Sequence, residues 1–203
     1  MRFLALIISV LPCFLFAQST TNTTDTTKPS AKAELYNFGT GNEFALKEGW
    51  KRFENSDISK VDCPKDWEVV ENFMETVFLI KEATANKEDV FAENVNLVRT
   101  TAQSSKSDDA DFSLNNFVEE TLVDHRNYFE EFELLEQKDG RYQKIKAVIL
   151  ILKGKANDIH FKIKQCFFIL NDYIYTFTFT SQKDSFDDYI STANDIYKSL
   201  IIK

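Results

Sequence analysis

Ala147–Leu152, with the sequence AVILIL, and Cys166–Leu170, with the sequence CFFIL, decide the fold of this chain. A strand with one solvated face alternates apolar and polar residues, because successive side chains point to opposite faces of the sheet. These two runs are apolar at every position, so their strands are expected to be covered on both faces. The covering layers have to come from amphipathic segments elsewhere in the chain.

Short turns around the two runs predict antiparallel neighbours. Asp139-Gly140 is a hairpin signal, residues 154–158 are expected to turn, and Asn171-Asp172 is a further tight turn. The strands between these turns are predicted over 132–137, 142–153, 159–170 and 173–181. Because parallel connections need a dozen or more residues, the sheet is predicted to be antiparallel.

Two amphipathic helices are the predicted covers. Ser113 is a suitable N-cap for the first helix, and the second is expected to start near Asp184 or Ser185. Apolar residues recur at three- and four-residue steps in each segment. The stripes are Leu114, Phe117, Val118, Thr121, Leu122, His125 and Phe129 in the first segment, and Phe186, Tyr189, Ile190, Ala193, Ile196, Tyr197, Leu200 and Ile201, to the C-terminus, in the second. The predicted fold class is α+β, with an antiparallel sheet sandwiched between helices.

The region before the first helix is expected to add short strands to the same domain. They are predicted over 50–54, 58–63, 67–70, 77–80 and 94–100. Glycines mark turns in residues 35–49, whose secondary structure the pattern leaves open. A single domain is therefore predicted over 35–203, with its core over 50–203.

The N-terminal segment predicts export. Residues 1–17 have a short positive start, a long apolar run and a small residue, Ala17, at the end, as in a secretory signal peptide. A lipoprotein, lipidated at Cys13, is the alternative. Residues 18–34 are rich in threonine and poor in apolar residues, which predicts a flexible leader. The mature protein is thus expected to be extracytoplasmic, either periplasmic or secreted.

Charge limits the classes of partner. The formal net charge of −8 argues against nucleic acid and against adhesion to anionic lipid, and no other segment is long and apolar enough for stable membrane insertion. Acidic residues concentrate in 108–136 and basic residues in 138–164. We expect these to be solvated faces that attract each other across the fold; a basic docking patch is the alternative.

Three segments resemble the PsbP-like superfamily, which includes the extrinsic photosystem II protein and bacterial DcrB-type exported proteins. They are Cys63-Pro64-Lys65-Asp66-Trp67, then Phe91-Ala92-Glu93-Asn94-Val95-Asn96-Leu97, then Tyr173-Ile174-Tyr175-Thr176-Phe177-Thr178 leading into a closing helix. The resemblance covers roughly 50–203 and implies an antiparallel sheet flanked by helices. Cys63 stands where family members tend to have an aromatic residue, and the features that tie plant members to photosystem II are absent. The resemblance therefore implies a fold more than a mechanism.

The histidines, the cysteines and one oxygen-rich cluster are the candidate chemical groups. His125 is expected to pack at the edge of the core, and His160 to be exposed at the start of a strand; neither has metal-ligand spacing. Cys63 and Cys166 are predicted to be separate buried thiols, with a disulfide as the alternative. An oxygen-rich cluster lacks the spacing of a calcium loop, and its asparagines are expected to bond local backbone; it comprises Glu88, Asp89, Glu93, Asn94 and Asn96. No catalytic, cofactor-binding or metal-binding residue is predicted.

Two functions remain. The favoured prediction is a non-enzymatic exported binding or accessory module that docks to a protein partner in the bacterial envelope. The alternative is a carrier that holds a small apolar ligand between sheet and helix, next to residues such as Phe177 and Phe179. The aromatic stripe that contains them is expected to be ordinary core under the last helix; it comprises Tyr173, Tyr175, Phe177 and Phe179.

Overall fold

The computed structural model describes residues 36–38, 45–55, 59–71, 73, 76–83, 91–102 and 114–202. The predicted signal peptide, the predicted leader and the predicted cap Ser113 lie outside these residues. In the part of the chain that is described, neither helix has the length and apolar character needed to cross a bilayer.

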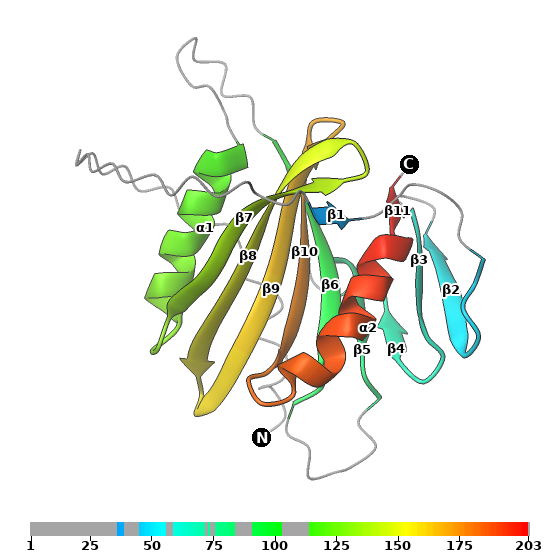
Figure 1. The fold of residues 1–203 in the computed structure, drawn as a ribbon, viewed down its shortest axis with the longest axis horizontal. Coiled ribbons are helices and arrows are strands. Elements are labelled where there is room, and N and C mark those ends of the chain that lie inside the picture. Colours follow the sequence, from blue (N-terminus) through cyan, green and yellow to red (C-terminus); the bar gives the residue numbers. More distant parts are fainter. Residues whose placement is uncertain are drawn as a thin grey trace.

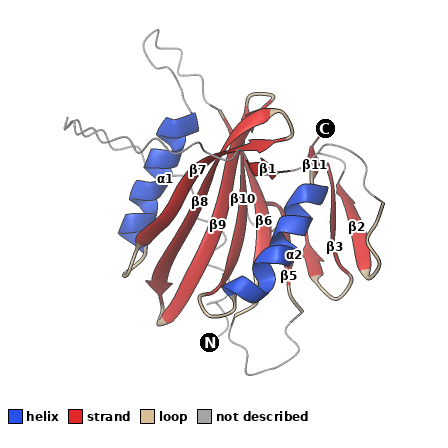
Figure 2. Cartoon of the chain, in the orientation of Figure 1, coloured by secondary structure: helices blue, strands red, loops and turns tan. Residues whose placement is uncertain are grey.

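The described residues contain eleven strands and two helices, joined by turns and loops (Figures 1 and 2). In chain order they are β1 Tyr36–Phe38, β2 Trp50–Asn55, β3 Ser59–Pro64, β4 Glu68–Val70, β5 Thr76–Lys81, β6 Asn94–Thr101, α1 Leu114–Tyr128, β7 Glu133–Tyr142, β8 Ile145–Ala156, β9 Ile159–Leu170, β10 Tyr173–Gln182, α2 Phe186–Ser199 and β11 Ile201–Ile202.

The helices cover opposite faces of the main sheet, whose strand order is β1-β7-β8-β9-β10-β6-β5-β4. Val148 and Phe167 pack in the core under α1, together with Leu122 of that helix. Their neighbours Ile149 and Cys166 pack in the core that includes α2. The continuous apolar runs are therefore buried on both sides, and the predicted α+β sandwich is confirmed (Figure 2).

Pairing in the main sheet is antiparallel with one exception. Strand β1 runs parallel to the end of β7, with Tyr36 opposite Gly140. In addition, β2 and β3 do not join the main sheet but form a second sheet in the order β11-β3-β2. The prediction of an antiparallel sheet is corrected in these two respects: the pairings β1–β7 and β11–β3 join segments that are far apart in sequence, and β2 pairs only with its neighbour β3.

The predicted hairpin turn at Asp139-Gly140 is wrong. Strand β7 continues through both residues, and Gly140 pairs with Ala147 of β8. The chain turns instead at Gln143 and Lys144, with Gln143 in the left-handed region at φ 53°. Pairing along the whole length of β7 and β8 outweighs the local preference of an Asp-Gly pair for a turn.

Paired left-handed residues close the next two hairpins. Asn157 and Asp158 have φ values of 51° and 65°, so the predicted turn over 154–158 shrinks to its last two residues. Asn171 and Asp172, at 50° and 62°, confirm the predicted turn there. Asn and Asp tolerate this conformation, which suits the twist of a two-residue hairpin.

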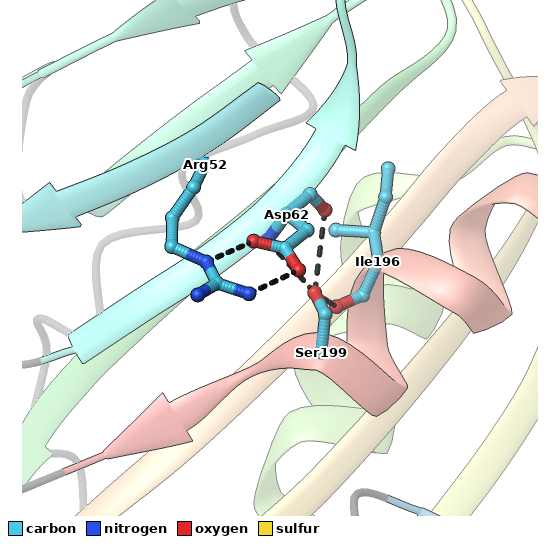
Figure 3. A network of polar contacts seen from close by, with 4 residues as sticks. All are labelled: Arg52, Asp62, Ile196 and Ser199. Carbon is cyan, nitrogen blue, oxygen red and sulfur yellow. Dashed lines mark hydrogen bonds and ion pairs between the residues drawn. The ribbon is translucent and has the colours of Figure 1, made fainter. Parts of the chain in front are cut away.

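The end of α2 is tied to the small sheet, as Figure 3 shows. Arg52 Nε and one terminal nitrogen donate to the Asp62 carboxylate at 2.7 and 3.0 Å. The Asp62 backbone N–H donates to Ser199 Oγ at 2.8 Å, and Ser199 Oγ donates to the Ile196 carbonyl at 2.7 Å. The helix stops at Ser199, and 201–202 pair with β3, so the helical spacing predicted to the C-terminus is wrong for the last residues.

Candidate functional site

His125 is a core residue. It is 4% exposed, and its Nε2 lies 2.8 Å from the side-chain carbonyl oxygen of Gln165, which makes Nε2 the donor. The Gln165 amide in turn donates to Thr178 Oγ1 at 3.3 Å. The His125 ring packs against Phe129 and Phe132, and its Nδ1 has no hydrogen-bond partner. The arrangement positions α1 on the sheet.

Burial lowers the pKa of His125, and hydrogen bonding to Gln165 opposes this only in part. The unfolded chain therefore binds a proton more readily than the folded protein does. The free energy of unfolding is expected to fall as the pH drops below about 6.5, by about 1.4 kcal/mol for each unit of difference in pKa. Denaturant titrations between pH 7.5 and 5 test this. His125→Gln should flatten the profile in that window; an unchanged slope would contradict it.

The predicted oxygen cluster is only partly described, since Glu88 and Asp89 lie outside the described residues. Glu93 is buried, and its carboxylate accepts hydrogen bonds from Ser181 Oγ at 3.1 Å and the Gln182 backbone N–H at 3.3 Å. Burial raises the pKa of Glu93 in spite of these bonds. Across the ranges that the structure describes, no group of three or more His, Cys, Asp and Glu is arranged to hold a metal ion.

The asparagines of the cluster differ in their contacts. Asn94 donates to the Ala92 carbonyl at 3.0 Å, which confirms the predicted bond to local backbone. Asn96 is 1% exposed, and neither atom of its side-chain amide has a partner, so the same prediction is wrong for Asn96. Its place in β6, opposite Thr178, points the amide to the face away from α2.

The aromatic stripe of β10 is core under α2, as predicted. Phe177 meets the Tyr197 ring edge to face at 4.6 Å between centroids, and Phe179 lies 5.3 Å from Phe186. Both side chains are almost fully buried in these contacts. The stripe therefore packs directly on α2. A carrier of a small apolar ligand would need an open cavity at this position.

The two cysteines are buried free thiols, in agreement with the favoured prediction. Burial raises the pKa of Cys63 to about 11 and that of Cys166 to about 12. Nucleophilic cysteines need the opposite shift, because the thiolate is the reactive form. Both thiols are therefore protonated at neutral pH.

A set of lysines on the main sheet forms the most distinctive charged surface. Beyond Leu152, β8 and β9 begin to alternate, and their lysines lie on the face that also carries Ile149 and Cys166. Figure 1 shows α2 over β10, β6 and β5, and lysines of β9 reach it, as Lys164 does to Asn194, so that among the described helices none lies over β8 on this face. We call Lys153, Lys155, Lys162 and Lys164 the lysine face.

The register of β8 and β9 places like charges opposite each other. Lys153 is directly opposite Lys162. Like charges at directly opposed positions of antiparallel strands are destabilising. Acidic residues surround the pair: Glu133 lies 2.6 Å from the Lys153 ammonium, and Asp187 lies 3.2 Å from that of Lys162. The pair of Glu133 with Lys153, and that of Glu130 with Lys155 at 3.8 Å, confirm that the acidic segment attracts the basic one across the fold; Asp187 belongs to α2.

Lys164 is the buried member of the lysine face. It is 9% exposed, its ammonium donates to Asn194 Oδ1 of α2 at 2.6 Å, and burial lowers its pKa. Sequence analysis found the basic segment but not its arrangement. The turn at Asn157 and Asp158 could have predicted this arrangement, because a two-residue hairpin there places Lys153 opposite Lys162.

A pocket of about 280 Å³ opens at the end of the lysine face, where the turns before β7 and after β10 approach β8 and β9. Most of its lining residues are charged; the residues are Glu131, Phe132, Glu133, Lys153, Gly154, His160, Phe161 and Lys183. His160 has an exposed side chain, as predicted, and its Nδ1 lies 3.8 Å from Glu131.

The main sheet and the two helices that cover its opposite faces define the class: an α+β protein with a PsbP-like fold. Among solved structures, the chain is similar to cyanobacterial PsbP from Synechocystis, with a TM-score of 0.54 and 13% identity over 76% of this chain and 93% of that one. This likeness confirms at the level of fold the resemblance drawn from sequence. No protein-family model matches the sequence, and no curated protein does.

Two further structures share the fold. A protein of unknown function from Pseudomonas aeruginosa has a TM-score of 0.53 and 11% identity, over 76% of this chain and 97% of its own. LpqN of Mycobacterium tuberculosis, described as involved in cell envelope biogenesis, has a TM-score of 0.53 and 13% identity, over 76% of this chain and 90% of its own. At these identities the likeness concerns the fold alone.

Proposed function

We propose that the protein is a non-enzymatic binding or accessory module of the bacterial envelope, and that it docks an acidic partner protein through the lysine face. The observation that carries the proposal is the direct opposition of Lys153 and Lys162 on β8 and β9, at the side of α2. The repulsion between the two ammonium groups destabilises the fold, whereas an acidic partner would attract both of them.

The environment of the lysine face suits protein docking. The lysine stems lie along the sheet beside partly buried apolar residues such as Ile151, and only the ammonium groups need to reach a partner. The acidic residues that pair with these lysines have more exposed side chains than the lysines themselves. The Asp187 side chain is 86% exposed, whereas that of Lys162 is 25% exposed. Such pairs contribute little to stability and can be exchanged for contacts with a partner's carboxylates.

Other features support the cellular role. The predicted signal peptide is consistent with work outside the cytoplasm, and LpqN, a structural neighbour, is described by its role in cell envelope biogenesis. The raised pKa values of both thiols and the hydrogen-bonded burial of His125 support a non-enzymatic module.

Affinity capture from envelope extract tests the proposal. Proteins bound by the wild-type protein are expected to fall at least about tenfold with the double variant Lys153→Glu, Lys162→Glu, because two attractions become repulsions. Binding to the wild type should also weaken as salt is raised from 50 to 500 mM.

The matched control is Lys144→Glu, Lys146→Glu, which makes the same change in net charge at two exposed positions at the start of β8. It should retain the captured proteins, and circular dichroism and thermal melts should show that both double variants are folded. Equal loss in the two variants would make net charge the cause, and no reproducible capture by the wild type would reject the proposal.

A further inference from the structure

A row of buried, uncharged polar side chains crosses the main sheet on its α1 side, opposite the face that carries the lysines. The register places Gln165 of β9 opposite Thr178 of β10, and Thr178 opposite Asn96 of β6. Thr180 follows on the same face of β10, diagonal to Asn96. Asn96 is 1% exposed and Thr180 is 0% exposed, and the other two residues are also buried. The polar atoms of this row are therefore separated from bulk water.

Hydrogen bonds along the row all run in one direction, from α1 toward β6. His125 Nε2 donates to the Gln165 side-chain oxygen at 2.8 Å, and the Gln165 amide donates to Thr178 Oγ1 at 3.3 Å. Because the Thr178 hydroxyl already accepts a bond, its own proton is available to an acceptor on the β6 side. In the described part of the chain, the two amide atoms of Asn96 and the hydroxyl of Thr180 have no hydrogen-bond partner. The chain of donors therefore ends beside three unpaired polar atoms.

The surroundings of these atoms favour a neutral ligand. Leu79 of β5 is opposite Asn96, and Ile163 of β9 is opposite Thr180; both are buried. The row itself carries no charged side chain, and burial lowers the pKa of His125, which favours the neutral ring. An ion would lose its hydration here without gaining an opposite charge. A small neutral molecule that both donates and accepts hydrogen bonds would instead satisfy atoms that are costly to leave unpaired.

We propose that Asn96, Thr178 and Thr180 bind one buried water molecule between β6 and β10. The water accepts hydrogen bonds from the Thr178 hydroxyl and the Asn96 amide nitrogen, and it donates to Thr180 Oγ1. Three hydrogen bonds to otherwise unpaired groups are typical of a buried water. The water extends the chain of hydrogen bonds that begins at α1, so that it reaches β6. The site is on the opposite side of the sheet from the lysine face and is independent of the docking proposal.

Nuclear Overhauser spectra of the isotope-labelled protein test for the water directly. The side-chain amide protons of Asn96 are expected to show a cross-peak at the water frequency, with the sign of a long-lived contact. The cross-peak should disappear in Thr180→Val, because the water loses one of its three partners. Native mass spectrometry of the wild type should give the mass of the chain without an organic ligand. The absence of the cross-peak in the wild type, or a retained organic molecule, would overturn the assignment.

Thermal melts distinguish a hydroxyl bound to water from one without a partner. If Thr180 binds the water, Thr180→Val is expected to lower the Tm by about 3–6 °C, because hydrogen bonds of buried groups are lost. If it does not, the same variant should raise the Tm, since valine keeps the shape and removes an unpaired polar group. The matched control is Thr176→Val, on the same strand and face at a partly exposed residue, with an expected shift below about 2 °C. A Tm of Thr180→Val equal to or above that of the wild type would reject the inference.

Discussion

Replacing Tyr142 by phenylalanine is expected to lower the free energy of unfolding by about 2–4 kcal/mol, although a single oxygen atom is removed. The Tyr142 hydroxyl is buried, donates to the Leu200 carbonyl at 3.1 Å and accepts from the Ile202 N–H at 3.0 Å. Burial raises the pKa of Tyr142, which keeps the hydroxyl proton available. Without it, two backbone groups in the C-terminal segment lose their side-chain partner.

The ring contacts of Tyr142 isolate the effect of the hydroxyl. Its ring stacks on Phe168 at 4.2 Å between centroids, and phenylalanine keeps that contact. Urea titration measures the loss, and Tyr173→Phe, at a partly exposed tyrosine of β10, is a control expected to change stability by less than about 0.5 kcal/mol. Equal, small effects of both variants would show that water or a local shift replaces the hydroxyl.

Gly154→Ala is expected to cost about 2–3 kcal/mol through overpacking. A Cβ atom at this position would lie 2.5 Å from Cγ and 2.9 Å from Cβ of Phe129, closer than van der Waals contact permits. Gly154 is within β8, where a glycine has no turn to make. Its absence of a side chain lets the segment after α1 pack directly on the sheet.

A double-mutant cycle with Phe129→Ala tests this cause. In the Phe129→Ala background the ring is gone, and Gly154→Ala should become nearly neutral in free energy of unfolding. The coupling between the two sites is then about 2–3 kcal/mol, as expected for residues in direct contact. If Gly154→Ala costs the same in both backgrounds, backbone conformation and not the Phe129 ring explains the glycine.

Local patterns predicted most of the helices and strands. The stripes over 114–129 and 186–197 predicted α1 and α2, because each segment can bury its apolar side only as a helix. The turn at Asn171-Asp172 was predicted for a similarly local reason. The prediction at Asp139-Gly140 was wrong because β8 offers β7 a longer run of paired backbone than a turn there would allow.

The candidate sites could be predicted from the sequence less well than the helices and strands. Lys153 and Lys162 are opposed only because the hairpin turns at two particular residues, and a shift of one residue would have changed the pairing. Glu131 and Lys183 are in separate turns, 52 positions apart by number, and no periodicity links them. The sequence contained the residues of both surfaces but no sign of their proximity.

By itself, the sequence determined that AVILIL and CFFIL would form buried strands with a helix on either side, because apolar side chains on both faces of a strand leave no face for water. The tertiary structure alone decided that β1 would join β7, that 201–202 would leave the helix to pair with β3, and that the charges of two turns would meet at one pocket. Those arrangements depend on contacts between distant segments, which form only when the whole chain packs and which no local pattern encodes.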